Sequence, residues 1–570
     1  MEVPMNTIQK AMKLGRYTDA VDRTLEKLKD DRISARIWNH DHTVWKPAPS
    51  EIANRLGWLA CPKNMMGAIP RIEQLVEQVL SAGYTHALLL GMGGSSLAPF
   101  VFRRIFGVTA GHLDLSVLDS TDPSAVLDQA SRLDPLKTLF IVSTKSGSTA
   151  ETLSFFRYFF NLTAGVAGPG AGEHFIAITD PGSALERLAQ EHDFRHTFLN
   201  DPDIGGRYSA LSHFGLVPAV LIGMDVHALL NQASRAARDY VSSDSPVAGD
   251  NTGDRLGGAL GRLALAGVDK CTIVASPAIA SFGVWLEQLL AESTGKEGKG
   301  ILPVEGESMG DVDTYGDDRL FVYLRLDGDD THDAAMDGVS GAGHPVIRIN
   351  LKDLYDLGGE FFHWEMATAV AGHVMGINPF DQPNVESAKI QARGMIEEFK
   401  REGKLPELTP TLEENGIAVY AGRKWTTLSE AINGFLALAQ PGDYAAIQAY
   451  IAPTEEFAAL LNEFRITIRD RHKIATTVGF GPRFLHSTGQ LHKGDGGNGL
   501  FIQITSRDAV DVPIPDVTGS DASTVSFGVL KAAQALGDRR ALLDAGRRVI
   551  RFHLSGDLAD GVQTLARNIS

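Results

Sequence analysis

The sequence predicts an α/β protein with two doubly wound parallel-sheet domains, a helical N-terminal region and an additional C-terminal α/β segment. Three observations carry this prediction. Short apolar runs alternate with helical patterns in two separate blocks of the chain, and glycine-rich turns join several runs to the helices that follow. This rhythm is typical of parallel sheets covered by helices. The length of 570 residues is too great for one core and favours two or three domains.

The first block gives the clearest alternation of elements. Apolar runs predict strands over residues 85–90, 115–119, 138–142 and 174–179. Amphipathic patterns predict helices over residues 68–82, 100–106, 123–132, 151–160 and 182–192. Parallel neighbours need such crossover helices, so this block is expected to form one sheet with helices on its faces.

The second block repeats this architecture with little repetition of sequence. Strands are expected over residues 270–275, 320–326 and 345–350, and helices over 280–293 and 360–375. Residues 401–445 resemble a linker and mixed region, and further strands are expected near Ile447, Ile474 and Phe501. The segment 508–522 is rich in Asp, Pro, Ser and Thr and is predicted to be a loop. The expected divisions are 1–60, 61–245, 256–400 and 401–570.

Composition and charge exclude several functional classes. The formal net charge of −17 argues against nucleic acid or an anionic membrane as the main partner. No apolar run reaches the length of a membrane span, and the N-terminus lacks the pattern of a signal peptide. Two cysteines, Cys61 and Cys271, are too few for a disulfide framework or a cysteine-based zinc site. We therefore expect a cytoplasmic protein.

The most informative stretch is the hydroxyl-rich loop of residues 143–149. Between a predicted strand and a predicted helix it places five hydroxyls, one lysine and one glycine. Backbone N–H groups and the positive end of a helix favour an anion at such a position, so the loop predicts a phosphate site. A capping box between Ser148 and Glu151 is the simpler alternative, and it leaves Thr144, Lys145, Ser146 and Thr149 unexplained.

Two glycine-rich loops are further candidates for parts of a binding site. The turn over residues 91–96 is not a dinucleotide fingerprint because Ser96 replaces its last glycine; it is either a tight turn or a second wall of the phosphate pocket. Arg207 follows Gly205 and Gly206, which would let the backbone approach a ligand closely. Its guanidinium could stabilise a developing oxyanion, or it could form a structural ion pair.

Helix 281–293 carries a candidate proton shuttle near its C-terminal end. Gln288 and Glu292 lie one turn apart and therefore share a face, while Gly295 marks the helix stop. A carboxylate in this position can move a proton, although an exposed, solvated glutamate is the plainer interpretation.

Two further segments hold a lysine and two histidines. Lys389 is expected inside a helix that Asp381 can cap, with a surface ion pair to Glu386 as the simple alternative. His486 and His492 are six residues apart, which does not fit one helical face, and no metal-ligand pattern surrounds them. We expect no metal site and interpret a histidine here as a proton donor.

Six ordered segments resemble the phosphoglucose isomerase (glucose-6-phosphate isomerase) family. They are Gly91 to Pro99, Thr144 to Thr149, Gly205 to Ser209, Gln288 to Lys296, Asn378 to Lys389 and Leu485 to Gln490. The resemblance covers roughly residues 80–495. His486 follows Lys389, whereas in most of the family the histidine comes first; this order is similar to that in the isomerase half of transaldolase–isomerase fusion proteins.

The resemblance implies two sugar-isomerase (SIS-type) domains and an aldose–ketose isomerisation through a cis-enediol. Glu292 would move the proton between C2 and C1, Arg207 would stabilise the enediolate, and His486 with Lys389 would open the sugar ring; His492 remains an alternative to His486. Gln288 and Gln382 would position sugar hydroxyls. Phosphate would bind beside Gly94 on Ser95, Thr144, Lys145, Ser146, Ser148 and Thr149.

The same resemblance implies no cofactor, a small sugar-phosphate substrate and a homodimer. Two alternatives stay open at this point. One is an isomerase of another hexose phosphate, such as mannose 6-phosphate. The other is a non-catalytic sugar-phosphate sensor, although such sensors typically lack the glutamate, lysine and histidine that are all present here.

Overall fold

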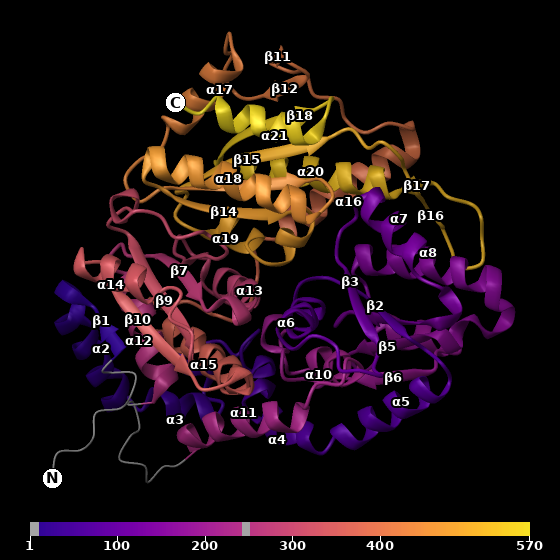
Figure 1. Ribbon diagram of the computed structural model, residues 1–570, viewed down its shortest axis with the longest axis horizontal. Helices are drawn as coiled ribbons and strands as arrows, with labels where there is room; N and C mark the ends of the chain where they lie inside the picture. The colour runs from indigo at the N-terminus through magenta and orange to yellow at the C-terminus, as the bar shows by residue number, and fades with distance from the viewer. Residues whose placement is uncertain (1–10, 242–250) are drawn as a thin grey trace.

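The structure, a computed structural model, describes residues 11–241 and 251–570. The expected boundary at 245 and the first ten residues of the expected N-terminal region lie outside the described residues. Within them, three sheets built mainly of parallel strands lie around a common centre, each flanked by helices (Figure 1). The α/β fold class is confirmed, and the three-sheet arrangement brings distant parts of the chain together.

The first sheet is entirely parallel and has the order β3-β2-β4-β5-β6. Its strands are β2 (His86–Gly91), β3 (Asp114–Leu118), β4 (Thr138–Ser143), β5 (Phe175–Thr179) and β6 (His196–Leu199). Its helices are α5 (Ile69–Ser81), α6 (Leu97–Phe106), α7 (Pro123–Arg132), α8 (Ala150–Ala167), α9 (Ala184–Glu191) and α10 (His213–Leu221). The four predicted strands are all present, and α8 runs well past the predicted end at 160.

The second sheet has the order β1-β10-β9-β7-β8, parallel except for the short edge strand β1. Its strands are β1 (Met12–Lys13), β7 (Lys270–Ala275), β8 (Leu302–Val304), β9 (Arg319–Leu326) and β10 (Val346–Leu351). The main helices here are α11 (Val226–Val241), α12 (Thr252–Ala264), α13 (Phe282–Thr294), α14 (Asp333–Gly341) and α15 (Leu357–Met375). Helices α2 (Thr18–Asp30) and α3 (Ile33–Trp38) belong to the N-terminal region, and α4 (Cys61–Met66) directly follows it.

The third sheet, orange to yellow in Figure 1, has the order β11-β12-β18-β15-β13-β14. Its strands are β11 (Leu412–Glu414), β12 (Ile417–Tyr420), β13 (Tyr444–Tyr450), β14 (Ala475–Phe480), β15 (Gly499–Ser506) and β18 (Arg548–Leu554). Its helices are α16 (Glu386–Glu402), α17 (Leu428–Leu436), α18 (Glu455–His472), α19 (Gly489–Gly494), α20 (Phe527–Asp544) and α21 (Leu558–Arg567).

Two predictions in this part of the chain were wrong in detail. Residues 401–445 are more than a linker, because β11 and β12 extend the third sheet through antiparallel pairing of β12 with β18. The segment 508–522 is not wholly a loop: β16 (Pro513–Ile514) pairs with β17 (Val525–Ser526) as a short ribbon. In both cases the partner strand lies far along the chain or is too short to show a periodic pattern.

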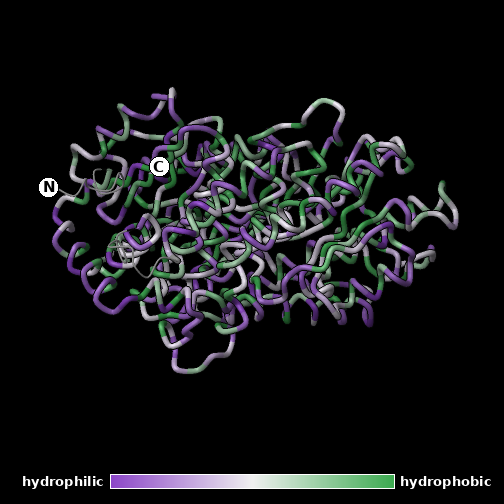
Figure 2. Tube along the Cα trace, turned by 90° about the horizontal axis from the view of Figure 1, so that it is seen from below, coloured by the Kyte–Doolittle hydropathy of each residue, from purple (hydrophilic) through white to green (hydrophobic). Residues whose placement is uncertain are grey.

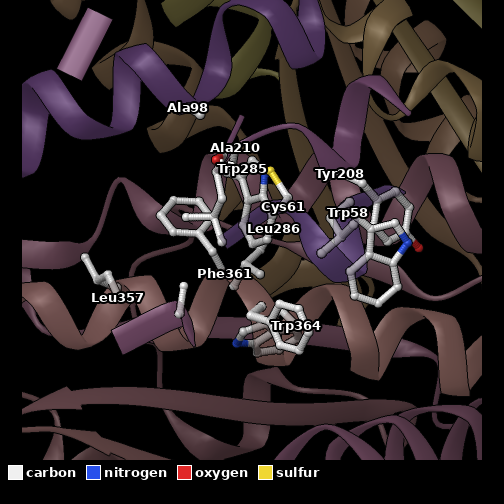
Figure 3. Packing of buried hydrophobic residues seen from close by; sticks show 14 of the residues in the cluster. Trp58, Cys61, Ala98, Tyr208, Ala210, Trp285, Leu286, Leu357, Phe361 and Trp364 are labelled. Carbon is white, nitrogen blue, oxygen red and sulfur yellow. Dashed lines mark hydrogen bonds between the residues drawn. The ribbon is translucent and has the colours of Figure 1, made fainter. Parts of the chain in front are cut away.

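The largest buried cluster joins the first two sheets to the N-terminal region. Figure 3 shows Trp58 beside Tyr208, and Trp285 beside Phe361 of α15. The ring centroids are 5.4 Å apart in the first pair and 4.5 Å in the second. Burial of aromatic side chains at such distances stabilises the interface and fixes α13 against α15. Hydrophobic stretches run through the interior in Figure 2, whereas the outer helices and loops carry more of the hydrophilic residues.

Among the described residues, none of the helices is both long enough and apolar enough to cross a membrane.

Candidate active site

Each of the three sheets together with its helices is called a unit below. A cavity of about 320 Å³ lies where elements of the first and third units meet. Three groups of residues line it. The hydroxyl-rich loop and the first turn of α8 form one wall, α16 forms the second, and the segment around His486 together with α20 forms the third. Glu151 and His486 lie 335 positions apart in the sequence, and the fold brings them to one pocket.

The hydroxyl-rich loop leads from β4 into α8. Ser146, Ser148 and Thr149 line the cavity, and hydroxyls of the loop are linked in pairs. The oxygens of Ser146 and Ser148 are 2.9 Å apart, and those of Thr144 and Thr149 are also 2.9 Å apart. The first turn of an 18-residue helix therefore faces the cavity together with hydroxyl groups, an arrangement suited to an anion.

The capping-box alternative is wrong. Thr149 is the N-cap of α8, and no side chain caps this end of the helix. Glu151 instead points to His486, as described below. Lys145 also departs from the expectation, because its ammonium pairs with Asp180 and donates to the Pro202 carbonyl oxygen at 2.8 Å. Lys145 does not line the cavity.

The glycine turn after β2 lets two other segments approach closely. A Cβ atom added to Gly93, whose φ is +54°, would lie 2.8 Å from the carbonyl oxygen of His486 and 3.0 Å from Nε2 of Gln288. Gly94 faces the backbone of Gly206, next to Arg207. Ser95 is buried, and its carbonyl oxygen accepts a hydrogen bond from the Ser143 hydroxyl at 3.1 Å. The glycines of this turn are therefore needed so that the segments that carry His486 and Arg207 can pack closely against it.

Arg207 is buried and every nitrogen of its guanidinium has a partner. Nε donates to the Ser293 hydroxyl at 2.8 Å, Nη1 donates to Oε1 of Gln382 at 3.0 Å, and Nη2 donates to the Pro379 carbonyl oxygen at 2.8 Å. Nη1 also lies 3.2 Å from a carboxylate oxygen of Glu292. The planar guanidinium is thus held rigidly beside the carboxylate, as an oxyanion-stabilising group would need to be.

Glu292 lies near the C-terminal end of α13, and Gln288 lies one turn before it. The Gln288 amide donates to Oε2 of Glu292 at 3.1 Å and to the His486 carbonyl oxygen at 2.8 Å. One side chain therefore connects the predicted base with the segment that carries the predicted acid. The Lys296 ammonium donates to the Asp381 side chain at 2.8 Å, and Glu292 acts on it through its charge.

The expected capping of α16 by Asp381 is also wrong, because the Asp381 side chain accepts from Lys296 instead. The helix begins at Glu386, its N-cap is Val385, and no side chain caps it. Burial and the charge of Arg207 lower the pKa of Lys296 to about 8, and Asp381 counteracts the shift. Asp381 therefore neutralises a buried cation next to Arg207.

His486 faces the cavity, and its Nε2 lies 3.0 Å from Oε1 of Glu151. Gln534 of α20 donates to the same carboxylate oxygen at 2.8 Å. Burial raises the pKa of Glu151, but the positive charges of His486 and Lys389 outweigh it and hold that pKa below its ordinary value. Glu151 is therefore an ionised partner that orients the imidazole.

His492 is not an equivalent alternative. It is 2% exposed and packs among Tyr444, Phe484 and Phe501. Burial lowers its pKa well below the ordinary value, and the charges of Lys493 and Arg547 act in the same direction. It does not line the cavity, so the geometry favours His486.

Lys389 lies on α16 and lines the cavity opposite the hydroxyl-rich loop. The alternative of an ion pair between Lys389 and Glu386 is wrong, because Glu386 pairs with Arg393 instead. Gln382 reaches Arg207 from the segment before α16 and is otherwise exposed. In the described part of the chain, no three His, Cys, Asp or Glu side chains gather in a way that would hold a metal ion.

Sequence reasoning missed Gly93, Ser293, Gln534 and the role of Glu151. Glu151 follows the hydroxyl-rich loop, where the sequence alone indicates only a possible cap. Gly93 was visible within the glycine turn, and Ser293 adjoins Glu292. Gln534 gave no signal, because it lies in a segment with no assigned motif and reaches Glu151 only through the fold.

Comparison with known proteins supports the family resemblance that the six sequence segments indicate. The family model for phosphoglucose isomerase matches residues 67–301. A glucose-6-phosphate isomerase of Rubrobacter xylanophilus is 30% identical over 385 residues, which cover 58% of this chain and 87% of that protein. One from Heliobacterium modesticaldum is 30% identical over 424 residues, covering 65% of this chain and 92% of that protein.

Two solved structures share the fold. A hypothetical protein from Thermus thermophilus superposes with a TM-score of 0.58 and 24% identity, covering 67% of this chain and 99% of that chain. A glucose-6-phosphate isomerase from Chlamydia trachomatis superposes with a TM-score of 0.58 and 19% identity, covering 70% and 92%.

Proposed function

Because this chain belongs to the phosphoglucose isomerase family, we propose that it interconverts glucose 6-phosphate and fructose 6-phosphate. The observation that carries the proposal is the contact of the Glu292 carboxylate with the Arg207 guanidinium, linked through Gln288 to the His486 segment. A base, a cation for a developing oxyanion and an imidazole are the groups that an enediol mechanism requires.

The reaction would begin with binding of the phosphate group. The hydroxyls of Ser146, Ser148 and Thr149 and the first turn of α8 face the cavity, and the ammonium of Lys389 lies on the opposite wall. We assign Ser95, Gly94 and Thr144 to the support of this site rather than to its surface. Lys145 would support the hydroxyl-rich loop through its ion pair with Asp180 and would not contact the phosphate.

Ring opening would use His486 and Lys389. The protonated imidazole would give its proton to the ring oxygen as the bond between C1 and that oxygen breaks, while a solvent water takes the proton of the C1 hydroxyl and C1 becomes a carbonyl carbon. Glu151 holds the imidazole in place through a contact of 3.0 Å. An imidazole held in one orientation beside the ring oxygen is suited to act as the proton donor.

Isomerisation would follow on the open-chain sugar. Glu292 would take the proton from C2, and the electron pair left behind would form the C1–C2 double bond of a cis-enediol. Arg207 would stabilise the negative charge that develops on the C1 oxygen, and the proton of the C2 hydroxyl would pass to that oxygen. Glu292 would then return its proton to C1 as the C2 carbonyl forms. Gln288 and Gln382 would position the sugar hydroxyls beside these groups.

The test is a coupled assay that starts from fructose 6-phosphate and reads glucose 6-phosphate through its dehydrogenase, with a chelator present. Wild-type turnover is expected, and Glu292→Gln should lose at least about 100-fold in kcat while still binding substrate. Turnover of Glu292→Gln within about threefold of wild type would remove the assignment of the base.

A matched control lies nearby on the same helix. Burial and the neighbouring Glu305 carboxylate raise the pKa of Glu287 to about 8, so this side chain is mostly neutral at pH 7. Glu287→Gln replaces a neutral group by a neutral one of the same size. It should keep wild-type turnover in the same assay.

We also propose that two copies assemble as a homodimer with the sites near the subunit contact, and that the protein is cytoplasmic. The family resemblance supports both proposals. Light scattering of the purified protein tests the first, since a homodimer has twice the chain mass of 61.3 kDa.

A further inference from the structure

Helix α20 of the third unit contacts the first unit at the edge of the active-site cavity. Phe527, at its start, stacks on Phe155 of α8 with ring centroids 5.7 Å apart. Lys531, one turn later, donates to the carboxylate of Asp122 at 2.7 Å, and Asp122 also caps α7. Two anchors therefore fix the first half of α20 on α7 and α8 (Figure 1).

Gln534 lies on the same face of α20, one turn after Lys531, and its amide is fixed at both ends. Its Nε2 donates to Oε1 of Glu151 at 2.8 Å, and its Oε1 accepts from the Thr121 hydroxyl at 2.9 Å. Thr121 is fully buried, Gln534 is 5% exposed and Glu151 is 6% exposed. Because the hydroxyl of Thr121 donates, the amide is oriented with its N–H towards the carboxylate.

The Glu151 oxygen that accepts from Gln534 is also the one that lies against His486. A buried carboxylate needs partners for its charge, and a hydrogen bond to a charged group is worth more than one between neutral groups. In the proposed reaction His486 gains and loses a proton, so its own charge changes during the cycle. Gln534 is then the neutral partner that keeps Glu151 in place through both states of the imidazole.

We propose that Gln534 is a positioning residue for ring opening, which acts on His486 through Glu151 and is oriented by Thr121. This inference rests on the proposed function. It adds to His486 and Lys389 of the third unit a residue from α20, a helix for which the sequence showed no motif. Gln534 does not need to touch the substrate to have this effect.

The first test is the variant Gln534→Leu, which keeps the size of the side chain and removes the donor. We expect kcat for fructose 6-phosphate to fall roughly tenfold, with KM changed by less than about twofold. The hydrogen bond favours the ionised form of Glu151, so its loss raises the pKa of Glu151 and moves the acid limb of the kcat–pH profile to higher pH. The charged groups that act on Glu151 are His486 and Lys389, and the Tyr450 hydroxyl is a further titratable group near it; all three remain in this variant.

The conservative variant Gln534→Glu gives a more specific readout. When protonated, the new carboxyl can donate to Glu151 as the amide does, and kcat at low pH should lie closer to wild type than that of Gln534→Leu. When the pH rises, two buried carboxylates would face each other and share one proton, so kcat should fall with pH. A merely structural role of residue 534 would not produce this inverted pH dependence.

The matched control is Gln503→Leu. Gln503 is also a buried glutamine, and it donates to the Ala535 carbonyl oxygen of α20 at 3.0 Å without a bond to Glu151. It should lose stability but keep the wild-type kcat and pH profile. If Gln534→Leu does not fold, Thr121→Val replaces it, and a smaller loss of kcat with the same shift of the acid limb is expected.

Three results would overturn the inference. The first is a Gln534→Leu enzyme, or the Thr121→Val enzyme that replaces it, with the kcat and pH profile of wild type. The second is an equal loss of kcat in Gln503→Leu. The third is a Gln534→Glu enzyme without the inverted pH dependence. Absence of turnover in the wild type would instead overturn the proposed function together with this inference. The two failures are therefore distinguishable in one series of assays.

Discussion

Gly94 and Gly206 face each other so closely that a Cβ atom added to Gly94 would lie 2.1 Å from the Gly206 carbonyl oxygen. Gly206 directly precedes Arg207, and the Ser209 hydroxyl donates to the Gly94 carbonyl oxygen at 3.2 Å. The contact between two glycines thus fixes the distance between the turn after β2 and the segment that carries the guanidinium.

We predict that Gly94→Ala displaces this segment. The added methyl group would overlap backbone atoms, which cannot move away as a side chain can, so Arg207 should shift relative to Glu292. We expect kcat to fall by about 100-fold or more and the melting temperature to decrease. Gly165→Ala in α8 is the control, because nothing lies within 4 Å of its Cβ position. Full activity of Gly94→Ala would contradict this interpretation of the contact.

Arg207→Lys should remove most of the activity even though it keeps the positive charge. A lysine cannot reproduce the bonds to Ser293, Gln382 and the Pro379 carbonyl oxygen at the same time. We expect kcat to fall by about 100- to 1,000-fold, the range for loss of an oxyanion-stabilising donor. Steady-state kinetics measures this, and a loss of less than about threefold would show that charge alone is sufficient.

Lys389→Met should lower kcat/KM by about 100-fold, because the ammonium is assigned to both phosphate binding and ring opening. Arg393→Met is the matched control on the same helix. Arg393 also lines the cavity, but its side chain is 64% exposed and already pairs with Glu386. Its loss should change kcat/KM by less than about threefold. Equal effects of the two variants would mean that the general positive charge of α16 matters rather than Lys389.

The stability of the protein should fall as the pH rises from about 5 to 8, in part because of Glu287. Its pKa is raised from 4.5 to about 8 in the folded protein, so in this window the folded state keeps a proton that the unfolded chain releases. The unfolding free energy then falls with pH at up to about 1.4 kcal/mol per unit for one such group.

Glu287→Gln removes this contribution. Its unfolding free energy should exceed that of wild type by an amount that grows between pH 5 and 8 and stays constant above about 8. Denaturant titrations at several pH values measure the difference. A difference that does not change with pH would show that Glu287 titrates normally in the folded protein.

Trp58→Ala should cost about 3–5 kcal/mol of unfolding free energy, because the side chain is fully buried. It should also lower kcat, since Trp58 packs on Tyr208, the residue after Arg207 (Figure 3). Urea unfolding and the coupled assay on the same preparation measure both. A destabilised variant with unchanged kcat would show that the indole supports the fold alone.

Local patterns were sufficient for most elements of the first two sheets. Helix α7 begins and ends where predicted, because Asp122 caps it and Pro123 occupies its first position. Strand β7 also has its predicted bounds. The edge strand β12 was missed because its pairing with β18 joins residues more than 130 positions apart, which no local pattern reveals.

The candidate site was predictable where chemistry lies in contiguous motifs and not where it depends on distant partners. The sequence predicts the hydroxyl-rich loop, Arg207, Glu292, Lys389 and His486 as site residues. The loop, Lys389 and His486 line one cavity, and the pair of Arg207 and Glu292 is connected to the His486 segment through Gln288. The direction of the Lys145 side chain was not predictable, because Asp180 lies on a separate loop. Which histidine faces the cavity also depended on packing, since His492 is held inside the third unit by aromatic rings.

The meeting of the first and third units at one cavity has a consequence for the order in which the protein becomes active. A ribosome produces Gly93, Arg207 and Glu292 early, and these parts can collapse onto their own cores while synthesis continues. The wall that closes the pocket, from Lys389 through His486 to α20, arrives only in the last third of the chain. Nascent chains should therefore hold sugar phosphate weakly or not at all until α20 has docked, so that turnover reports completed assembly of the molecule.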